Sequence, residues 1–129
     1  MQIWPYIPVH MSKLAWWLVL FLAILQAGAM VMEIFCWHRV ATDVGGYQGN
    51  IIRDTWKLGA NMGLYNGFLA AGLAWSLLWP PELGATVALF FVSCVVVAGV
   101  FGAFTVSWLL LIQALLVMVP LVALLIRPH

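Results

Sequence analysis

The segment that decides the fold, residues 61–75, reads NMGLYNGFLAAGLAW. Gly63, Gly67 and Ala71 recur at every fourth residue, so a helix places them along one flank. A stripe of small side chains lets a second helix approach closely, as membrane helices do when they pack. The segment therefore predicts a tightly packed membrane helix. Three polar side chains lie near its start: Asn61, Tyr65 and Asn66.

The composition of the whole chain agrees with a membrane setting. Of its 129 residues, 66% are hydrophobic and 7% are charged, and the mean hydropathy is +1.10. A soluble domain of this size cannot bury so much apolar surface, so the lipid bilayer is the expected solvent and partner. The net charge of +1 excludes nucleic acid, because no basic stripe is present to neutralise phosphates. We therefore expect one all-α membrane domain over residues 1–129.

Four apolar runs are close to the length of about 20 residues that crosses a bilayer. They lie at about 14–37, 58–79, 85–102 and 107–126. The connection 38–57 carries most of the charge and ends in an amphipathic lead-in, and the segment before Lys13 predicts a short interfacial N-terminal arm. The first run continues past the small residues 27–29, which favours an uncleaved membrane helix over a signal peptide. The sequence thus predicts an integral membrane antiparallel four-helix bundle.

The tryptophans support this topology, because indole side chains prefer the two interfaces of a bilayer. In four antiparallel spans, one interface receives Trp16, Trp17, Trp75 and Trp79. The opposite interface receives Trp37, Trp56 and Trp108. Two separate belts are the pattern expected for short connections between alternating spans.

Polar side chains from three of the predicted helices share one leaflet in this topology. They are Glu33 from the first helix, Asn61, Tyr65 and Asn66 from the second, and Gln113 from the fourth, with Gln26 of the first helix deeper, near mid-membrane. A carboxylate at membrane depth costs about 2.5–3.5 kcal/mol at a helix centre, which makes Glu33 a candidate functional residue. One interpretation is a polar pocket that binds a ligand. The simpler interpretation is that Glu33 accepts hydrogen bonds from the second helix and fixes its register.

Cofactors and catalysis receive no support from the sequence. No histidine lies at mid-membrane to bind a haem, and His38 has no second histidine nearby to share a metal. Cys36 and Cys94 fall in different predicted helices without metal-ligand spacing. Because no nucleophile–base pair or phosphate-binding loop is present, we expect no cofactor, no metal and no catalytic residue.

Residues 61–73 resemble the signature of a bacterial family of small four-span membrane proteins, domain-of-unknown-function family 1304. Residues 33–35 and 97–103 resemble it as well. The resemblance implies an inner-membrane helical bundle whose recurring pattern includes Glu33, Asn61, Tyr65 and Asn66, and it implies no activity. The family more often has glutamine at the position of Met62 and histidine at that of Gln26. Loss of a titratable group at Gln26 argues against metal or proton-relay chemistry.

Three functions follow as hypotheses for this multi-pass protein of the bacterial inner membrane. The first is a non-catalytic accessory subunit, associating in a complex or homo-oligomer through the stripe of Gly63, Gly67 and Ala71. The second is a binder or transporter of a small lipophilic molecule, with Glu33 in its pocket. The third is an enzyme acting on a lipid-like substrate, for which only Glu33 and Tyr65 offer acid–base groups.

Overall fold

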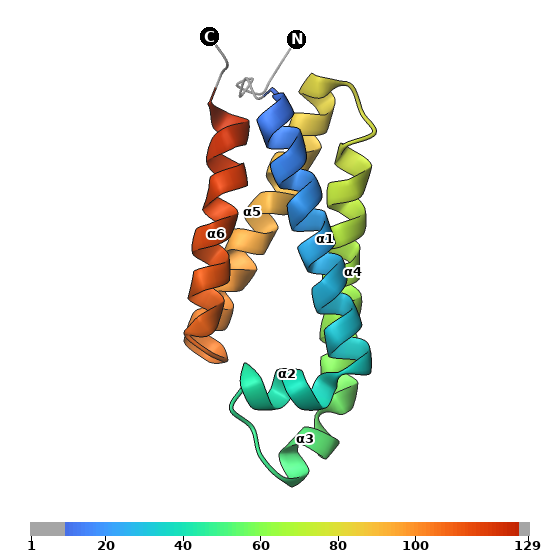
Figure 1. Cartoon of the computed structure of the whole chain (residues 1–129), viewed down its shortest axis with the longest axis vertical. Coiled ribbons are helices and arrows are strands. Elements are labelled where there is room, and N and C mark those ends of the chain that lie inside the picture. Colours follow the sequence, from blue (N-terminus) through green and yellow to red (C-terminus); the bar gives the residue numbers. More distant parts are fainter. Residues whose placement is uncertain (1–9, 127–129) are drawn as a thin grey trace, which may run out of the picture.

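The computed structural model describes residues 10–126, and every regular element in this range is a helix. Four helices are long and two are short, and the short ones lie in the connection between the first and second long helices (Figure 1). In chain order they are α1 (Lys13–Phe35), α2 (Trp37–Asp43), α3 (Asn50–Asp54), α4 (Trp56–Ser76), α5 (Pro81–Thr105) and α6 (Leu109–Leu125). The predicted N-terminal arm falls mostly in residues 1–9, outside the described residues.

The four long helices alternate in direction and form two pairs, α1 with α4 and α5 with α6 (Figure 1). The helices of each pair contact each other far more extensively than those of different pairs. Between the pairs, α4 contacts α5 and α1 contacts α6. Short connections impose this order, because the chain turns back within a few residues at 77–80 and at 106–108.

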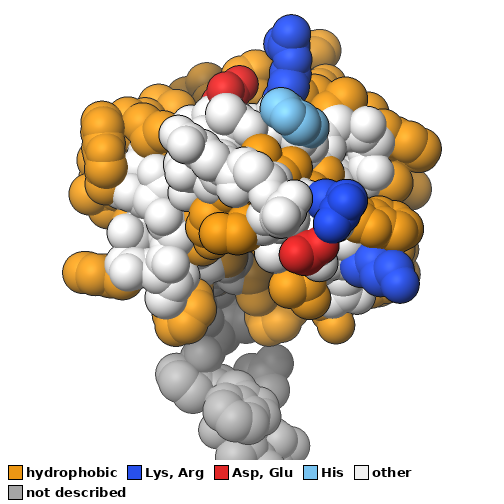
Figure 2. Space-filling model, turned by 90° about the horizontal axis from the view of Figure 1, so that it is seen from below, with side chains coloured by type: hydrophobic (Ala, Val, Ile, Leu, Met, Phe, Trp, Pro, Cys, Tyr) orange, Lys and Arg blue, Asp and Glu red, His pale blue; other side chains and the backbone are white. Residues whose placement is uncertain are grey.

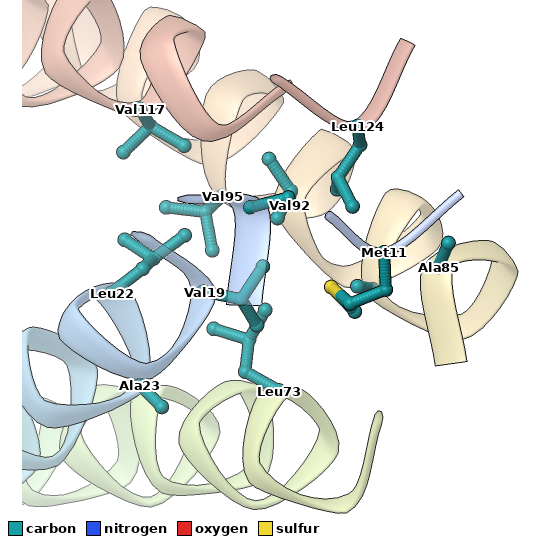
Figure 3. Packing of buried hydrophobic residues seen from close by; sticks show 12 residues of the cluster. Met11, Val19, Leu22, Ala23, Leu73, Ala85, Val92, Val95, Val117 and Leu124 are labelled. Atoms are coloured by element: carbon teal, nitrogen blue, oxygen red, sulfur yellow. The ribbon is translucent and has the colours of Figure 1, made fainter. Parts of the chain in front are cut away.

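The pairs join through an apolar cluster at the end where α1 and α5 begin, here called the packed end. Figure 3 shows Val19 and Leu22 of α1 lying beside Val92 and Val95 of α5, with Leu73 reaching them from α4. The buried members of the cluster are Met11, Ala15, Val19, Leu22, Ala23, Leu73, Ala85, Ala88, Val92, Val95, Val117 and Leu124. Residues from all four long helices therefore hold the two pairs together at this end.

At the other end, here called the open end, the pairs are further apart and α2 lies across them (Figure 1). Figure 2 looks onto this end, where basic, acidic and His side chains gather among hydrophobic ones. The connection turns sharply because Gly46 and Gly49 adopt positive φ angles of 69° and 65°, which favour glycine. The charged residues of the connection are thus concentrated at one end of the molecule.

Local signals explain where the helices begin and end. Ser12 caps α1 by accepting a hydrogen bond at 3.1 Å from the amide of Ala15. Pro81 occupies the first turn of α5, where its missing N–H costs nothing. The helix predicted over 14–37 is interrupted at Cys36, whose backbone leaves the helical region, and Trp37 opens α2. The other three long helices begin and end within four residues of the predicted bounds.

The outer faces of the long helices are apolar. Phe21 of α1, Phe68 of α4, Phe90 of α5 and Leu116 of α6 are each more than half exposed. By length and composition, α1 and α5 are able to cross a membrane. The helix α6 is apolar but shorter, with 17 residues. Large hydrophobic side chains therefore face outward along every long helix.

Candidate functional site

A hydrogen bond between two polar side chains joins α1 to α4 near the open end. The amide Nδ2 of Asn66 donates to Oε2 of Glu33 across 2.7 Å, and both side chains are half-buried. Glu33 lies in the last turn of α1, and Asn66 lies three turns into α4. This contact is the tie between helices that the simpler interpretation of the sequence predicted.

Glycines on α4 allow the two helices to come close enough for this bond. A Cβ atom added to Gly63 would lie 2.8 Å from Cγ1 of Ile34 and 3.0 Å from the carbonyl oxygen of Met30. A Cβ atom on Gly67 would lie 2.5 Å from Sδ of Met30. Two members of the predicted stripe are therefore packed against α1 within the chain. Association with a partner through this stripe stays a prediction, and within the stripe only Ala71 is exposed for it.

A cavity of about 330 Å³ opens beside Glu33, between α1, α2 and α6. Apolar side chains dominate its lining, and four polar or charged side chains interrupt it. The lining residues are Ala29, Met32, Glu33, Arg39, Val40, Asp43, Val44, Leu110 and Gln113. Since Gln113 is 80 residues from Glu33 in the chain, the topology alone brings these two predicted residues to one cavity.

The short helix α2 is held over the open end by Trp37. The indole Nε1 donates a hydrogen bond of 3.1 Å to Oγ1 of Thr55, just before α4 begins. The indole ring also lies directly against Gly59 of α4, where any Cβ atom would overlap it. This anchor fixes the start of α2, so that Arg39 and Asp43 reach the cavity.

The charges around the cavity are not paired with each other. Over residues 10–126 the one ion pair joins Arg53 to Asp54, at 3.7 Å and largely exposed to solvent. Arg39 and Asp43 lie four residues apart on α2 and are exposed, whereas Glu33 is half-buried. The cavity thus has one inner carboxyl group, that of Glu33, and two oppositely charged groups at its exposed rim, those of Arg39 and Asp43.

Four of the predicted site residues do not line this cavity, and of these Asn66 contacts the lining residue Glu33. Asn61 and Tyr65 are exposed on the outer face of α4, and the Tyr65 ring stacks edge-on with Phe68 at 6.0 Å. Gln26 is 2% exposed, and its Oε1 atom has no hydrogen-bond partner among the described residues. The structure therefore brings Glu33 and Gln113 to the cavity, ties Asn66 to Glu33 by a hydrogen bond, and separates the other three.

Residues 20–126 match the family described as Protein of unknown function (DUF1304). The chain belongs to this family. The match covers all six helices except the first turns of α1. No curated protein and no solved structure matches the chain.

In this DUF1304 chain, sequence reasoning missed Arg39 and Asp43 as residues of the cavity. Both lie in the segment 38–57, which we predicted to be a connection between two helices, so their shared helical face was not recognised. The signal was present, since a spacing of four residues places two side chains on one face of a helix. Their position over the cavity, however, depends on the break at Cys36 and on the contact between Trp37 and Gly59.

The described residues around the cavity do not form a set of metal ligands. Among residues 10–126, no group of three or more His, Cys, Asp and Glu side chains lies close enough to hold an ion. Glu33 and Asp43 supply carboxylate oxygens, Gln113 supplies an amide, and Arg39 supplies a guanidinium group. These groups bind ligands by charge and hydrogen bonding.

Proposed function

We propose that this chain is a multi-pass inner-membrane protein that binds a small lipophilic molecule in the cavity beside Glu33. The cavity carries the proposal, because its lining combines apolar walls with a few polar groups, as small-molecule sites do. Its volume of about 330 Å³ is at the lower end of the range of ligand pockets, roughly 300–1,000 Å³.

The outer surface supports the membrane part of the proposal. The most apolar stretches of α1 and α5 are only 22% buried inside the molecule, whereas a core helix of a soluble protein is mostly buried. Monomeric soluble proteins rarely expose contiguous apolar patches larger than a few hundred Å². A lipid environment removes this cost for all four long helices.

Selective filling of the cavity tests the binding function. Ala29 lines the cavity and is half-buried, so Ala29→Leu places additional carbon atoms inside it. Ala74→Leu is the matched control, because Ala74 is exposed on α4. We expect small molecules that co-purify with the protein in mild detergent, measured by mass spectrometry, to be lost from Ala29→Leu and retained by Ala74→Leu. Identical extracts from both variants would contradict the proposal.

Association with another membrane protein is a second candidate, favoured by the outer face of α4. Tyr65 is 60% exposed and Asn61 is also exposed, on a helix that is less apolar than α1 and α5. Polar side chains in transmembrane helices usually face other protein segments and hydrogen-bond across helices. A partner helix lying on this face would cover both groups, which suits an accessory subunit.

Native purification tests this second candidate. We expect the wild-type protein to migrate in mild detergent at a mass above that of one chain. If this face forms the contact, the double variant Tyr65→Trp, Asn61→Leu should migrate at the mass of a single chain. A single chain without a co-purifying protein in the wild type would argue against an accessory subunit.

A further inference from the structure

We infer that the molecule bound in the cavity is a lipophilic cation, such as a protonated amine carrying an apolar chain. This inference rests on the proposed binding function and names the class of ligand. Glu33 would be the counter-ion for the positive group. The apolar walls formed by Ala29, Met32 and Leu110 would contact the chain.

The distribution of charge around the cavity favours a cation. Arg39 and Asp43 are one helical turn apart at the exposed rim, so their opposite charges largely cancel for a ligand inside. Glu33 is the remaining titratable group of the lining, and it lies deeper than either of them, half-buried in the last turn of α1. When it is ionised, Glu33 makes the interior of the cavity negative.

The partner that Glu33 has within the chain does not neutralise it. Asn66 donates one hydrogen bond to Oε2, and an amide carries no net charge. The described residues hold no ion pair to Glu33. An ionised carboxyl group removed from water is stabilised when an opposite charge reaches it, and an uncharged or anionic ligand supplies none. A cationic head group would meet this need.

The rest of the lining is compatible with an ammonium group. Gln113 enters the cavity from α6, and its amide oxygen is able to accept a hydrogen bond from a donor. An ammonium group carries donors and no acceptor. Two acceptors from different helices, Glu33 and Gln113, therefore match its donors, while the Arg39 guanidinium group is exposed at the rim.

A matched series of ten-carbon amphiphiles tests the inference. Decylamine, decanol and decanoate share a chain and differ in the head group, which at pH 7 is cationic, neutral and anionic respectively. Saturable binding of each radiolabelled compound is measured with the full chain in phosphatidylcholine nanodiscs. Empty nanodiscs measure the partition into lipid, which is subtracted.

We expect decylamine to bind at least about tenfold more tightly than decanol or decanoate, and Glu33→Gln to remove most of this preference. Glu82→Gln is the control with the same loss of charge, because Glu82 is exposed in the first turn of α5 at the packed end. Its affinity for decylamine should stay within about twofold of the wild type.

Two variants on α2 keep the test decisive if Glu33→Gln does not fold. Arg39 and Asp43 are exposed, so their substitution leaves the helix packing intact. Arg39→Gln should tighten decylamine binding by about two- to fivefold, and Asp43→Asn should weaken it by a similar factor. Unchanged affinity in both variants would contradict a cation held in this cavity.

The remaining outcomes separate the inference from the proposed function. Equal affinity for decanol and decylamine, unaffected by Glu33→Gln, would overturn the cation and leave binding in the cavity intact. Tightest binding of decanoate, lost in Arg39→Gln, would overturn the cation in favour of an anion. Absence of saturable binding for all three compounds would overturn both the inference and the proposed function.

Discussion

The packed end and the open end of this molecule are built from the same four helices by different contacts. At the packed end, side chains such as Val19, Leu73 and Val92 from three helices are fully buried against one another. At the open end the helices of each pair remain close, as Gly63 against α1 and Gly99 against Ala114 show, but a cavity separates the pairs. Packing within each pair is therefore present at both ends, whereas the two pairs join at the packed end and their separation at the open end creates the candidate site.

The largest expected effect comes from a cavity made at the packed end. Leu73 of α4 is fully buried, so Leu73→Ala should lower the free energy of unfolding by about 2–5 kcal/mol. Leu58 lies on the same helix at the open end and is 64% exposed. Leu58→Ala should therefore change the free energy of unfolding by less than about 0.5 kcal/mol. Unfolding in mild detergent, titrated with a denaturing detergent, measures both. Equal losses would show that the two ends do not differ in packing.

The second largest loss of stability is expected where α1 and α4 approach closely. Gly63→Ala forces a methyl group against Ile34 and the Met30 backbone, which should destabilise the protein by about 1–3 kcal/mol. Gly28→Ala is the control within α1, because nothing lies within 4 Å of its added Cβ atom. That variant should be neutral or slightly more stable, since alanine favours helix. The same unfolding measurement applies, and a neutral Gly63→Ala would mean that the pair is not tightly packed.

The hydrogen bond between Glu33 and Asn66 should contribute less to the free energy of unfolding than the close packing at Gly63. Asn66→Ala removes the donor and should cost about 0.6–2 kcal/mol, the range of hydrogen bonds between membrane helices. A double-mutant cycle with Glu33→Gln isolates the coupling between the two side chains. Asn61→Ala, exposed on the same helix, serves as the control and should have little effect. Zero coupling energy would assign Glu33 to the cavity alone.

The smallest expected effect has the opposite sign. The Oε1 atom of Gln26 is buried without a hydrogen-bond partner among the described residues. Gln26→Leu replaces this polar group by an apolar side chain of similar size and should raise the free energy of unfolding by about 1 kcal/mol. Gln113→Leu is the comparison, because Gln113 lines the cavity and is half-buried. A destabilised Gln26→Leu would indicate that Gln26 has a hydrogen-bond partner outside the described residues.

Much of the helical organisation could be predicted from local signals. Apolar runs, Pro80–Pro81 and the glycine-rich connection located the long helices to within a few residues. The prediction failed at Cys36, where an apolar run continues across a change of helix direction. The hydrophobicity of a segment predicts the length of an apolar run. It does not predict a bend that depends on tertiary contacts, such as the contact of Trp37 with Gly59.

The candidate site could be predicted only in part. Glu33 and Asn66 were recognised as polar groups at matching depths, and the structure joins them by a hydrogen bond. Asn61 and Tyr65 share the same depth but lie on the outer face of α4. Depth along a helix follows from the sequence, whereas the direction of each side chain depends on the rotation of the helix about its axis.

The sequence by itself determined an all-helical chain with four long apolar helices and one polar end, because composition and turn signals act locally. Only the tertiary structure decided that Gly63 and Gly67 pack within the chain. It also brought Arg39 and Asp43 over the cavity beside Glu33. These outcomes depend on how the helices rotate and tilt against one another, which is set by the sum of contacts among distant residues.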